Sequence, residues 1–333
     1  MRSAGSGRDL CDEEAAMQKL TLDTDGNPEV SSGPVPSCSD AEVLLKARAC
    51  VLSRRGVADA GDTPVSAANG RHLSLGRCFT GIIEKAGGRV EALAPGDRVV
   101  AFHTDGGFAE YHSVPAYHVV KLPMGISFEE GAIAALMPTV LNGMECAQVK
   151  GRSVFISGAG TTGLLSTQIA RISGAATVIA ADLHAKRLQR ARDAGADTVI
   201  NVSTEDAQRR VMDQTGGMGV DVCLECAGNE SSFFQCAAML RPGGKLVVLK
   251  PVTRSVSIEM QAWSERSLQL IMGREQPFET AYLLERGLKL VGIGAVRLRP
   301  LLSHVFPVHR IAEALELIDG HPNLAVEVAL IRA

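Results

Sequence analysis

Hydrophobic and polar residues alternate along the chain in two different patterns. Between residues 17 and 122, short apolar runs such as Val43–Cys50 and Val99–Phe102 are separated by turns rich in Gly, Pro and Asp. Short strands at this spacing predict a compact β domain. After Lys150, strand-like runs alternate with helix-like segments. That alternation predicts a parallel sheet with helices on both faces, so the fold class is α/β.

The second part of the chain has a regular predicted order. Expected strands cover 154–157, 177–182, 198–201, 220–226 and 245–249, and expected helices cover 162–173, 184–194, 204–214 and 231–240. Gly243 and Gly244 are expected to turn the chain into the strand that begins at Lys245. We also expect a helical segment at 275–285 and a closing strand at 325–331. Ser127 and Glu130 form a capping-box signature ahead of an Ala-rich helix.

One glycine-rich stretch carries a specific chemical signal. The apolar run Val154–Ser157 ends in Gly158-Ala159-Gly160-Thr161-Thr162-Gly163, and a helix-patterned segment follows directly. The first glycine permits a tight turn, the second lets the backbone approach a diphosphate, and the third lets the helix pack closely on the strand. The N–H groups and the dipole at the helix start attract phosphates. The stretch predicts a dinucleotide site; the alternative is a βαβ unit of another kind of α/β protein.

The next expected strand ends in an acid, Asp182, about twenty residues after the glycines. A carboxylate at this place accepts hydrogen bonds from a ribose 2′-OH and repels a 2′-phosphate, so it predicts NAD rather than NADP as the cofactor. Arg187 follows closely and softens that preference. The predicted cofactor-binding residues are Gly158, Gly160, Thr161, Thr162, Gly163, Asp182, Arg187 and Ala227.

Composition excludes several classes of partner. Hydrophobic residues make up 46% of the 333 residues, charged residues make up 21%, and the net charge is −3. This balance gives a large core but no basic surface for nucleic acid or anionic lipid. Apolar runs stay shorter than the roughly 18 residues of a membrane span, and the first residues lack a signal-peptide stretch. We therefore expect a cytoplasmic protein that binds neither nucleic acid nor membrane.

Eight cysteines are spread through apolar segments, which suits reduced thiols. Cys223 and Cys226 form a C-x-x-C, a spacing found in metal and redox sites. They lie within an apolar run that predicts a buried strand, where residues three apart point to opposite faces. The favoured interpretation is two core thiols.

Several motifs stand in an order and spacing that resembles the medium-chain dehydrogenase/reductase superfamily. They are Pro95–Val99, Gly107–Tyr111, the glycine-rich turn, Leu240–Lys245 and the closing segment His304–Ile318. The resemblance runs from about residue 17 to the end. It implies a GroES-like β domain, a Rossmann domain, bound NAD(P) and a homodimer or homotetramer. It also implies a helical region at 265–284 and an edge strand within 280–300, where relatives pair their subunits. On this basis we expect a disordered leader at 1–15, a GroES-like substrate domain at 16–135 and a Rossmann domain at 136–285. Residues 286–333 would end the Rossmann sheet and return to the first domain.

The chain departs from the zinc-type members at their metal ligands. Aligned on Arg48–Cys50, the family's cysteine ligand falls at Ser53 and its relay hydroxyl falls at Arg55. The histidine ligand falls at Arg77 and the third ligand falls near Met137. The loop in which zinc-type members carry four cysteines for structural zinc is missing from this chain. Zinc takes three Cys, His or carboxylate ligands at a catalytic site and four at a structural one, so we expect no metal.

Other groups must then handle charge and protons. Arg77 is the first candidate for holding a developing oxyanion or a substrate anion, because in the alignment it replaces the family's histidine ligand, and Arg54 and Arg55 also lie at or beside the former ligand positions. Ser53, Cys78 and His103 are candidates for moving a proton. The alternative is a surface role for Arg77 and His103.

The sequence thus predicts an enzyme, a zinc-independent and NAD-dependent oxidoreductase. It would transfer a hydride between nicotinamide and a small polar or anionic alcohol or carbonyl compound, in a biosynthetic pathway. Three alternatives stay open: a zinc-free enoyl- or quinone-type C=C reductase, a redox-neutral enzyme that recycles NAD, and an idle nucleotide-binding scaffold. No motif names the substrate.

Overall fold

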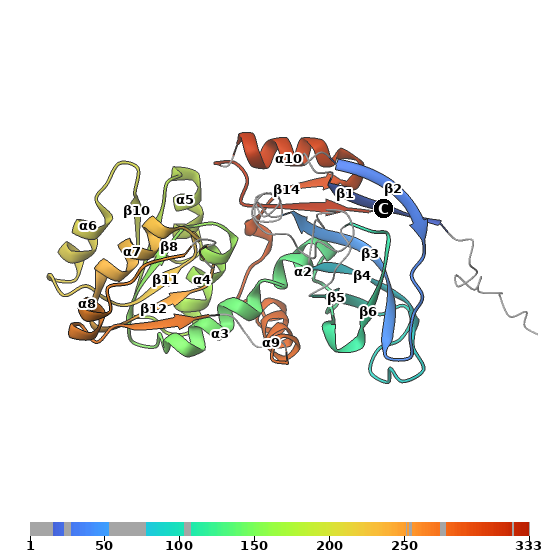
Figure 1. Ribbon diagram of the computed structural model, residues 1–333, viewed down its shortest axis with the longest axis horizontal. Helices are drawn as coiled ribbons and strands as arrows, with labels where there is room; N and C mark the ends of the chain where they lie inside the picture. The colour runs from blue at the N-terminus through green and yellow to red at the C-terminus, as the bar shows by residue number, and fades with distance from the viewer. Residues whose placement is uncertain are drawn as a thin grey trace, which may run out of the picture. The chain divides into compact units, whose positions relative to one another are not determined.

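The computed structural model describes residues 16–22, 28–52, 78–102, 108–250, 252, 255–273, 278–321 and 323–332. The chain divides into two compact units, which Figure 1 shows as ribbons. The antiparallel unit comprises Met1–Ala135, His304–Gly320 and Val328–Ala333, and the parallel unit comprises Leu136–Ser303 and His321–Glu327.

A six-stranded parallel sheet forms the centre of the parallel unit. Its strands are β8 (Ser153–Ser157), β9 (Thr177–Asp182), β10 (Thr198–Asn201), β11 (Val220–Glu225), β12 (Leu240–Val248) and β13 (Gln269–Met272). Their spatial order is β10-β9-β8-β11-β12-β13. The chain begins in the middle of the sheet, moves to one edge and then crosses to the other, which is the strand order of the Rossmann fold. The predicted fold class is confirmed.

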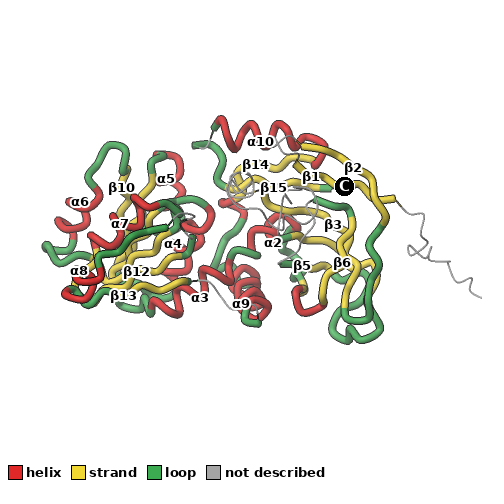
Figure 2. The backbone as a smooth tube through the Cα atoms, in the orientation of Figure 1, coloured by secondary structure: helices red, strands yellow, loops and turns green. Residues whose placement is uncertain are grey.

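Helices connect these strands, and Figure 2 shows them on both sides of the sheet. They are α3 (Met137–Ala147), α4 (Thr161–Ile172), α5 (Ala185–Asp193), α6 (Ala207–Gln214), α7 (Glu230–Met239), α8 (Met260–Glu265), α9 (Thr280–Gly292) and η2 (Arg299–Leu301). None of the helices in the described ranges has the length and hydrophobicity needed to cross a bilayer.

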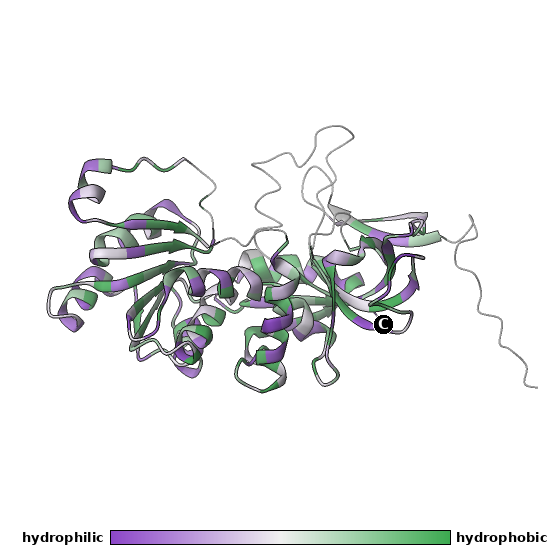
Figure 3. Cartoon of the chain, turned by 90° about the horizontal axis from the view of Figure 1, so that it is seen from below, coloured by the Kyte–Doolittle hydropathy of each residue, from purple (hydrophilic) through white to green (hydrophobic). Residues whose placement is uncertain are grey.

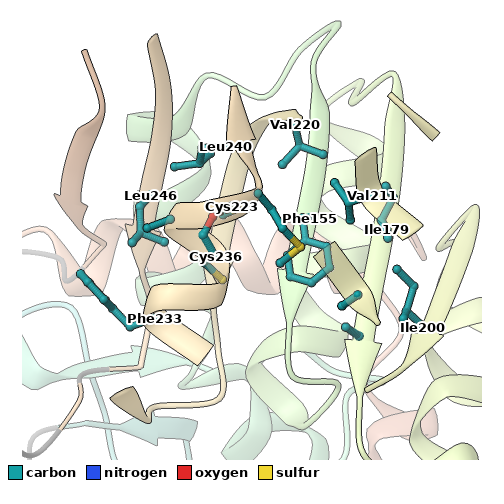
Figure 4. Packing of buried hydrophobic residues seen from close by; sticks show 14 of the residues in the cluster. Phe155, Ile179, Ile200, Val211, Val220, Cys223, Phe233, Cys236, Leu240 and Leu246 are labelled. Atoms are coloured by element: carbon teal, nitrogen blue, oxygen red, sulfur yellow. Dashed lines mark hydrogen bonds between the residues drawn. The ribbon is translucent and has the colours of Figure 1, made fainter. Parts of the chain in front are cut away.

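The core on one face of the sheet lies between the strands and helices α6 and α7, as Figure 4 shows. Phe155 of β8 packs there with Val211 of α6 and with Phe233 and Cys236 of α7, and each is at most 4% exposed. Burial of a large apolar side chain contributes about 1.5–3 kcal/mol, so this cluster holds the sheet and its helices together. The next residue, Ile156, points to the opposite face because strand residues alternate, and α4 packs there.

The two cysteines of the C-x-x-C have separate neighbours, which confirms them as core thiols. The Cys223 Sγ lies 3.3 Å from the carbonyl oxygen of Cys236, whereas the Cys226 Sγ lies 3.8 Å from the Ser166 hydroxyl. Both side chains are buried, and burial raises the pKa of the Cys226 thiol well above its ordinary value.

Three predicted elements were wrong. Strand β12 begins at Leu240 and continues through Gly243, where φ is +74° and the N–H donates to the Arg266 carbonyl at 2.8 Å, so this glycine makes a kink within a strand. Strand β13 replaces the start of the expected helical region, because Gln269–Met272 pairs with β12. The edge strand expected within 280–300 is helical, because Leu284 and Leu288 are spaced to bury one side of α9.

A second sheet, antiparallel, contains β3 (Glu42–Leu52), β4 (Phe79–Ala86), β5 (Arg98–Ala101), β6 (Tyr111–Pro115), β7 (Val119–Lys121), β14 (Leu302–Pro307) and β15 (Glu327–Ile331). The order is β14-β15-β3-β4-β5-β7, and β6 also pairs with β3. Leu330 lies opposite Cys50 in the β15–β3 pair, which confirms that the closing strand returns to the first part of the chain. Figure 3 shows hydrophobic residues concentrated in the strands of both sheets.

The remaining elements follow local sequence signals. Strands β1 (Ala16–Leu22) and β2 (Pro28–Pro34) form an antiparallel hairpin. Helix α2 (Phe128–Ala134) begins with the predicted capping box: the Ser127 hydroxyl accepts from the Glu130 N–H at 3.2 Å, and the Glu130 carboxylate accepts from the Ser127 N–H at 3.1 Å. The chain also forms η1 (Ala116–His118), η3 (Val308–Arg310) and α10 (Ile311–Gly320).

Candidate functional site

The candidate site lies at the carboxyl ends of the parallel strands, where ligands bind in sheets of this kind. The turn from β8 into α4 begins at Gly158, which has φ +93°, a conformation that glycine adopts at little cost. Its N–H donates to the Ala181 carbonyl at 2.8 Å and so ties the turn to the end of β9. A Cβ here would stand 3.1 Å from the Ala227 nitrogen, so the turn also closely approaches the loop after β11.

The other two glycines meet different needs. A Cβ on Gly163 would overlap the carbonyl oxygen of Gly158, so helix and turn are packed too closely for any side chain. Gly160 precedes the first residue of α4, and a Cβ there would meet no protein atom within 4 Å. The fold itself therefore does not require glycine at position 160. Open space beside the helix start is what a diphosphate needs in order to reach the backbone N–H groups.

Asp182 ends β9 and is 8% exposed. Its carboxylate accepts one hydrogen bond from the Ala159 N–H at 2.8 Å and another from the His184 N–H at 2.9 Å. The acid therefore joins the glycine-rich turn to the start of α5. The nearest Arg187 nitrogen lies 4.0 Å from the carboxylate, and Arg187 also donates to the Ala325 carbonyl at 2.7 Å.

The loop after β11 is organised by Glu225, a fully buried acid that the sequence analysis did not single out. Its carboxylate accepts from the N–H groups of Ala227 and Gly228 at 2.9 and 2.8 Å, and from the Ser232 hydroxyl at 2.6 Å. Burial raises the pKa of Glu225, although these hydrogen bonds and the charge of Lys250 act in the opposite direction. In the sequence, Glu225 could have been singled out because it is an acid at the end of an apolar run.

A C-terminal segment also reaches the site and was not foreseen. The Thr161 hydroxyl, on the first residue of α4, donates to the Glu327 carboxylate at 2.6 Å and lies 3.2 Å from the Val326 carbonyl. Glu327 is 4% exposed. Thr161 and Glu327 are 166 residues apart in the sequence, and no local pattern predicts their contact.

The predicted cofactor residues thus gather at one edge of one sheet. Gly158, Gly160, Thr161 and Gly163 form the turn and the start of α4, and Thr162 is the second residue of that helix. Asp182 contacts the turn, Arg187 lies beside Asp182, and the loop at Ala227 approaches Gly158. These contacts all lie within the parallel unit.

The predicted catalytic residues are a different case. Ser53, Arg55, Arg77 and His103 lie outside the described residues. Cys78 is described, and it lies partly buried just before β4 in the antiparallel unit. Within the described residues, no three His, Cys, Asp or Glu side chains are grouped so that they would hold a metal ion.

Sequence matches to known proteins identify the family of this chain. Residues 39–124 match the family described as alcohol dehydrogenase GroES-like domain, and residues 161–293 match that described as zinc-binding dehydrogenase. L-threonine 3-dehydrogenase from Symbiobacterium thermophilum is 31% identical over 322 residues, which cover 86% of this chain and 90% of that protein. This chain belongs to the medium-chain dehydrogenase superfamily.

Further similarities place this medium-chain dehydrogenase among the zinc-type members. Sorbitol dehydrogenase from Bos taurus is 26% identical over 333 residues, which cover 89% of this chain and 91% of that protein. A Sinorhizobium meliloti protein, proposed to be a zinc-binding dehydrogenase and solved with NADP bound, superposes with a TM-score of 0.82. It is 26% identical, and the match covers 96% of this chain and all of that one. The resemblance to the superfamily is thereby confirmed, with its GroES-like and Rossmann parts.

Proposed function

We propose that this medium-chain dehydrogenase transfers a hydride between NAD(H) and a small polar or anionic alcohol or carbonyl compound. The observation that carries the proposal is the carboxylate of Asp182, held against the glycine-rich turn by the Ala159 N–H. It combines the two features that recognise NAD, a diphosphate cradle and an acid for the adenosine ribose, in one hydrogen-bonded unit.

The residues present fit a dinucleotide. The open space at Gly160 and the first N–H groups of α4 suit the diphosphate, and the Asp182 carboxylate at the end of β9 suits a ribose 2′-OH. The loop at Ala227, fixed by Glu225, borders the turn on the side away from Asp182. NAD bound here would supply the hydride chemistry, and the protein would supply position and electrostatics.

The substrate class follows from the relatives. Threonine and sorbitol, which name two of them, are small polar compounds with secondary hydroxyl groups. We extend this class to the present chain and place Arg77 at the substrate, where a guanidinium would hold an oxyanion or a carboxylate. Ser53, Arg55, Cys78 and His103 remain candidates for proton transfer.

Zinc independence is part of the proposal. The sequence puts Ser53 and Arg77 at two of the family's ligand positions. Met137, near the third position, is fully buried in α3 and packs against Gly287 of α9, so its thioether is a core group. A catalytic zinc needs three Cys, His or carboxylate ligands, which these residues do not provide.

Cofactor titration tests the main proposal. Purified protein is expected to bind NADH more tightly than NADPH, measured by the change in nicotinamide fluorescence. It is also expected to oxidise at least one compound in a panel of small polyols, hydroxy acids and amino alcohols. Failure to bind either dinucleotide would contradict the proposal. The homo-oligomer, the cytoplasmic location and the biosynthetic role remain predictions from the sequence.

Metal analysis tests zinc independence separately. Protein purified without chelators is expected to contain much less than one zinc per chain, and its activity is expected to survive treatment with EDTA. One zinc per chain, together with loss of activity on chelation, would show that the ligand assignment is wrong.

A further inference from the structure

The carboxylate of Glu327 lies beside the first residue of α4, at the place where the proposed dinucleotide would put its diphosphate. Thr161 is that first residue, and its hydroxyl donates to the carboxylate at 2.6 Å. Glu327 is 4% exposed, so its charge is little screened by water. A helix start attracts anions, and here an acid of the chain itself stands next to it.

The backbone around Glu327 is fixed from several directions. The Ser303 hydroxyl donates to the Glu327 carbonyl at 2.7 Å and accepts from the Val326 N–H at 3.1 Å. Arg187 donates to the Ala325 carbonyl at 2.7 Å. Because the segment is held at consecutive residues, the carboxylate can leave Thr161 only by rotation of its own side chain.

A diphosphate would add two negative charges near this carboxylate. Like charges at short separation in poorly solvated surroundings oppose binding. A second acid, Asp182, contacts the same turn, where its carboxylate accepts from the Ala159 N–H. Ligand phosphates therefore meet a turn and helix start that two acids of the chain already contact.

We propose that Glu327 is an affinity-determining residue, an internal anion that competes with the diphosphate of the cofactor for the start of α4. The inference rests on the proposed function, because it takes the glycine-rich turn as the diphosphate site. NAD(H) binds either by displacing the Glu327 carboxylate from the Thr161 hydroxyl or in spite of the repulsion between that carboxylate and its own diphosphate. The consequence is weak cofactor binding and fast cofactor release.

Charge removal at position 327 tests this inference. Glu327→Gln keeps a carbonyl oxygen that accepts from Thr161 but loses the charge, and we expect its Kd for NADH to fall about tenfold. The Kd for ADP-ribose, which also carries the diphosphate, is expected to fall by the same factor in Glu327→Gln. Adenosine, which has no phosphate, is expected to compete with NADH equally well in the wild type and in Glu327→Gln. Glu285→Gln, which removes an exposed acid on α9, is the matched control and is expected to leave every constant unchanged.

Two results would overturn the inference. The first is a Kd for NADH in Glu327→Gln that is equal to or higher than that of the wild type, with thermal melting unchanged. The second is an equal gain for adenosine and ADP-ribose. If Glu327→Gln melts early, Glu327→Ala provides a second test with the same expected direction. If the wild type and all variants fail to bind NADH and ADP-ribose, the proposed function itself is wrong.

Discussion

The ends of β9 and β11 lie on either side of the central strand β8, and each ends in a buried acid that plays a different part. At the end of β9, Asp182 accepts one N–H from the glycine-rich turn and one from the next loop, and 8% of its surface is exposed. At the end of β11, Glu225 is fully buried and its bonds go to its own loop and to Ser232. The environment, and not the residue type, decides which acid remains available to a ligand.

The largest expected effect is on stability. Glu225→Ala leaves two buried N–H groups and a hydroxyl without their acceptor, and we expect it to lower the free energy of unfolding by about 3 kcal/mol. Asp182→Ala should cost less than half of that, because it leaves two N–H groups but no hydroxyl without an acceptor, and the Asp182 side chain is 8% exposed whereas Glu225 is fully buried. Urea unfolding followed by circular dichroism measures both. Equal losses of unfolding free energy in the two variants would show that Asp182 and Glu225 contribute equally to stability.

The next effect is on cofactor choice. Asp182→Ala removes the charge that repels a 2′-phosphate, so the ratio of the NADPH and NADH dissociation constants should shift about tenfold toward NADPH, or about 1.4 kcal/mol. Glu225→Gln serves as the control and should leave that ratio unchanged, even where both constants rise. A shift in the control of the same size would mean that loop geometry, and not charge, sets the preference.

The smallest effect concerns pH. Burial raises the pKa of Glu225 above its ordinary value of 4.5, so the folded protein binds this proton more tightly than the unfolded chain does. The contribution of Glu225 to stability is therefore greatest below pH 4.5 and falls as the pH rises through the raised pKa. The stability of the wild type relative to Glu225→Gln should decline from pH 4.5 to 7. A constant difference over that range would show that Glu225 is not perturbed.

Much of the fold could be predicted because its signals are local. Alternating apolar runs located β8 to β11, and Ser127 with Glu130 located the start of α2. Strand β13 was missed because it has only four residues, mostly exposed, and shows no period to detect. Its pairing with β12 places it in the sheet, and the sequence of β13 alone does not predict that pairing.

The candidate site divides in the same way. Glycines 158, 160 and 163 and Asp182 follow from one motif and its spacing, so the sequence was sufficient to place them. Glu327 depends on a contact with Thr161 across 166 residues, and Glu225 depends on which backbone groups its loop turns inward. Such partners are set by tertiary packing, which single-sequence patterns do not record.

The pairing of β15 with β3 has a consequence for how the protein is made. Cys50 and Leu330, which face each other in that pair, are separated by 280 residues. A ribosome therefore completes the parallel sheet while the Ala49–Leu52 part of β3, beyond its pairing with β6, still lacks its partner, and an open edge of this kind attracts foreign strands. Val328–Ile331, which follow the whole parallel sheet in the sequence, close it.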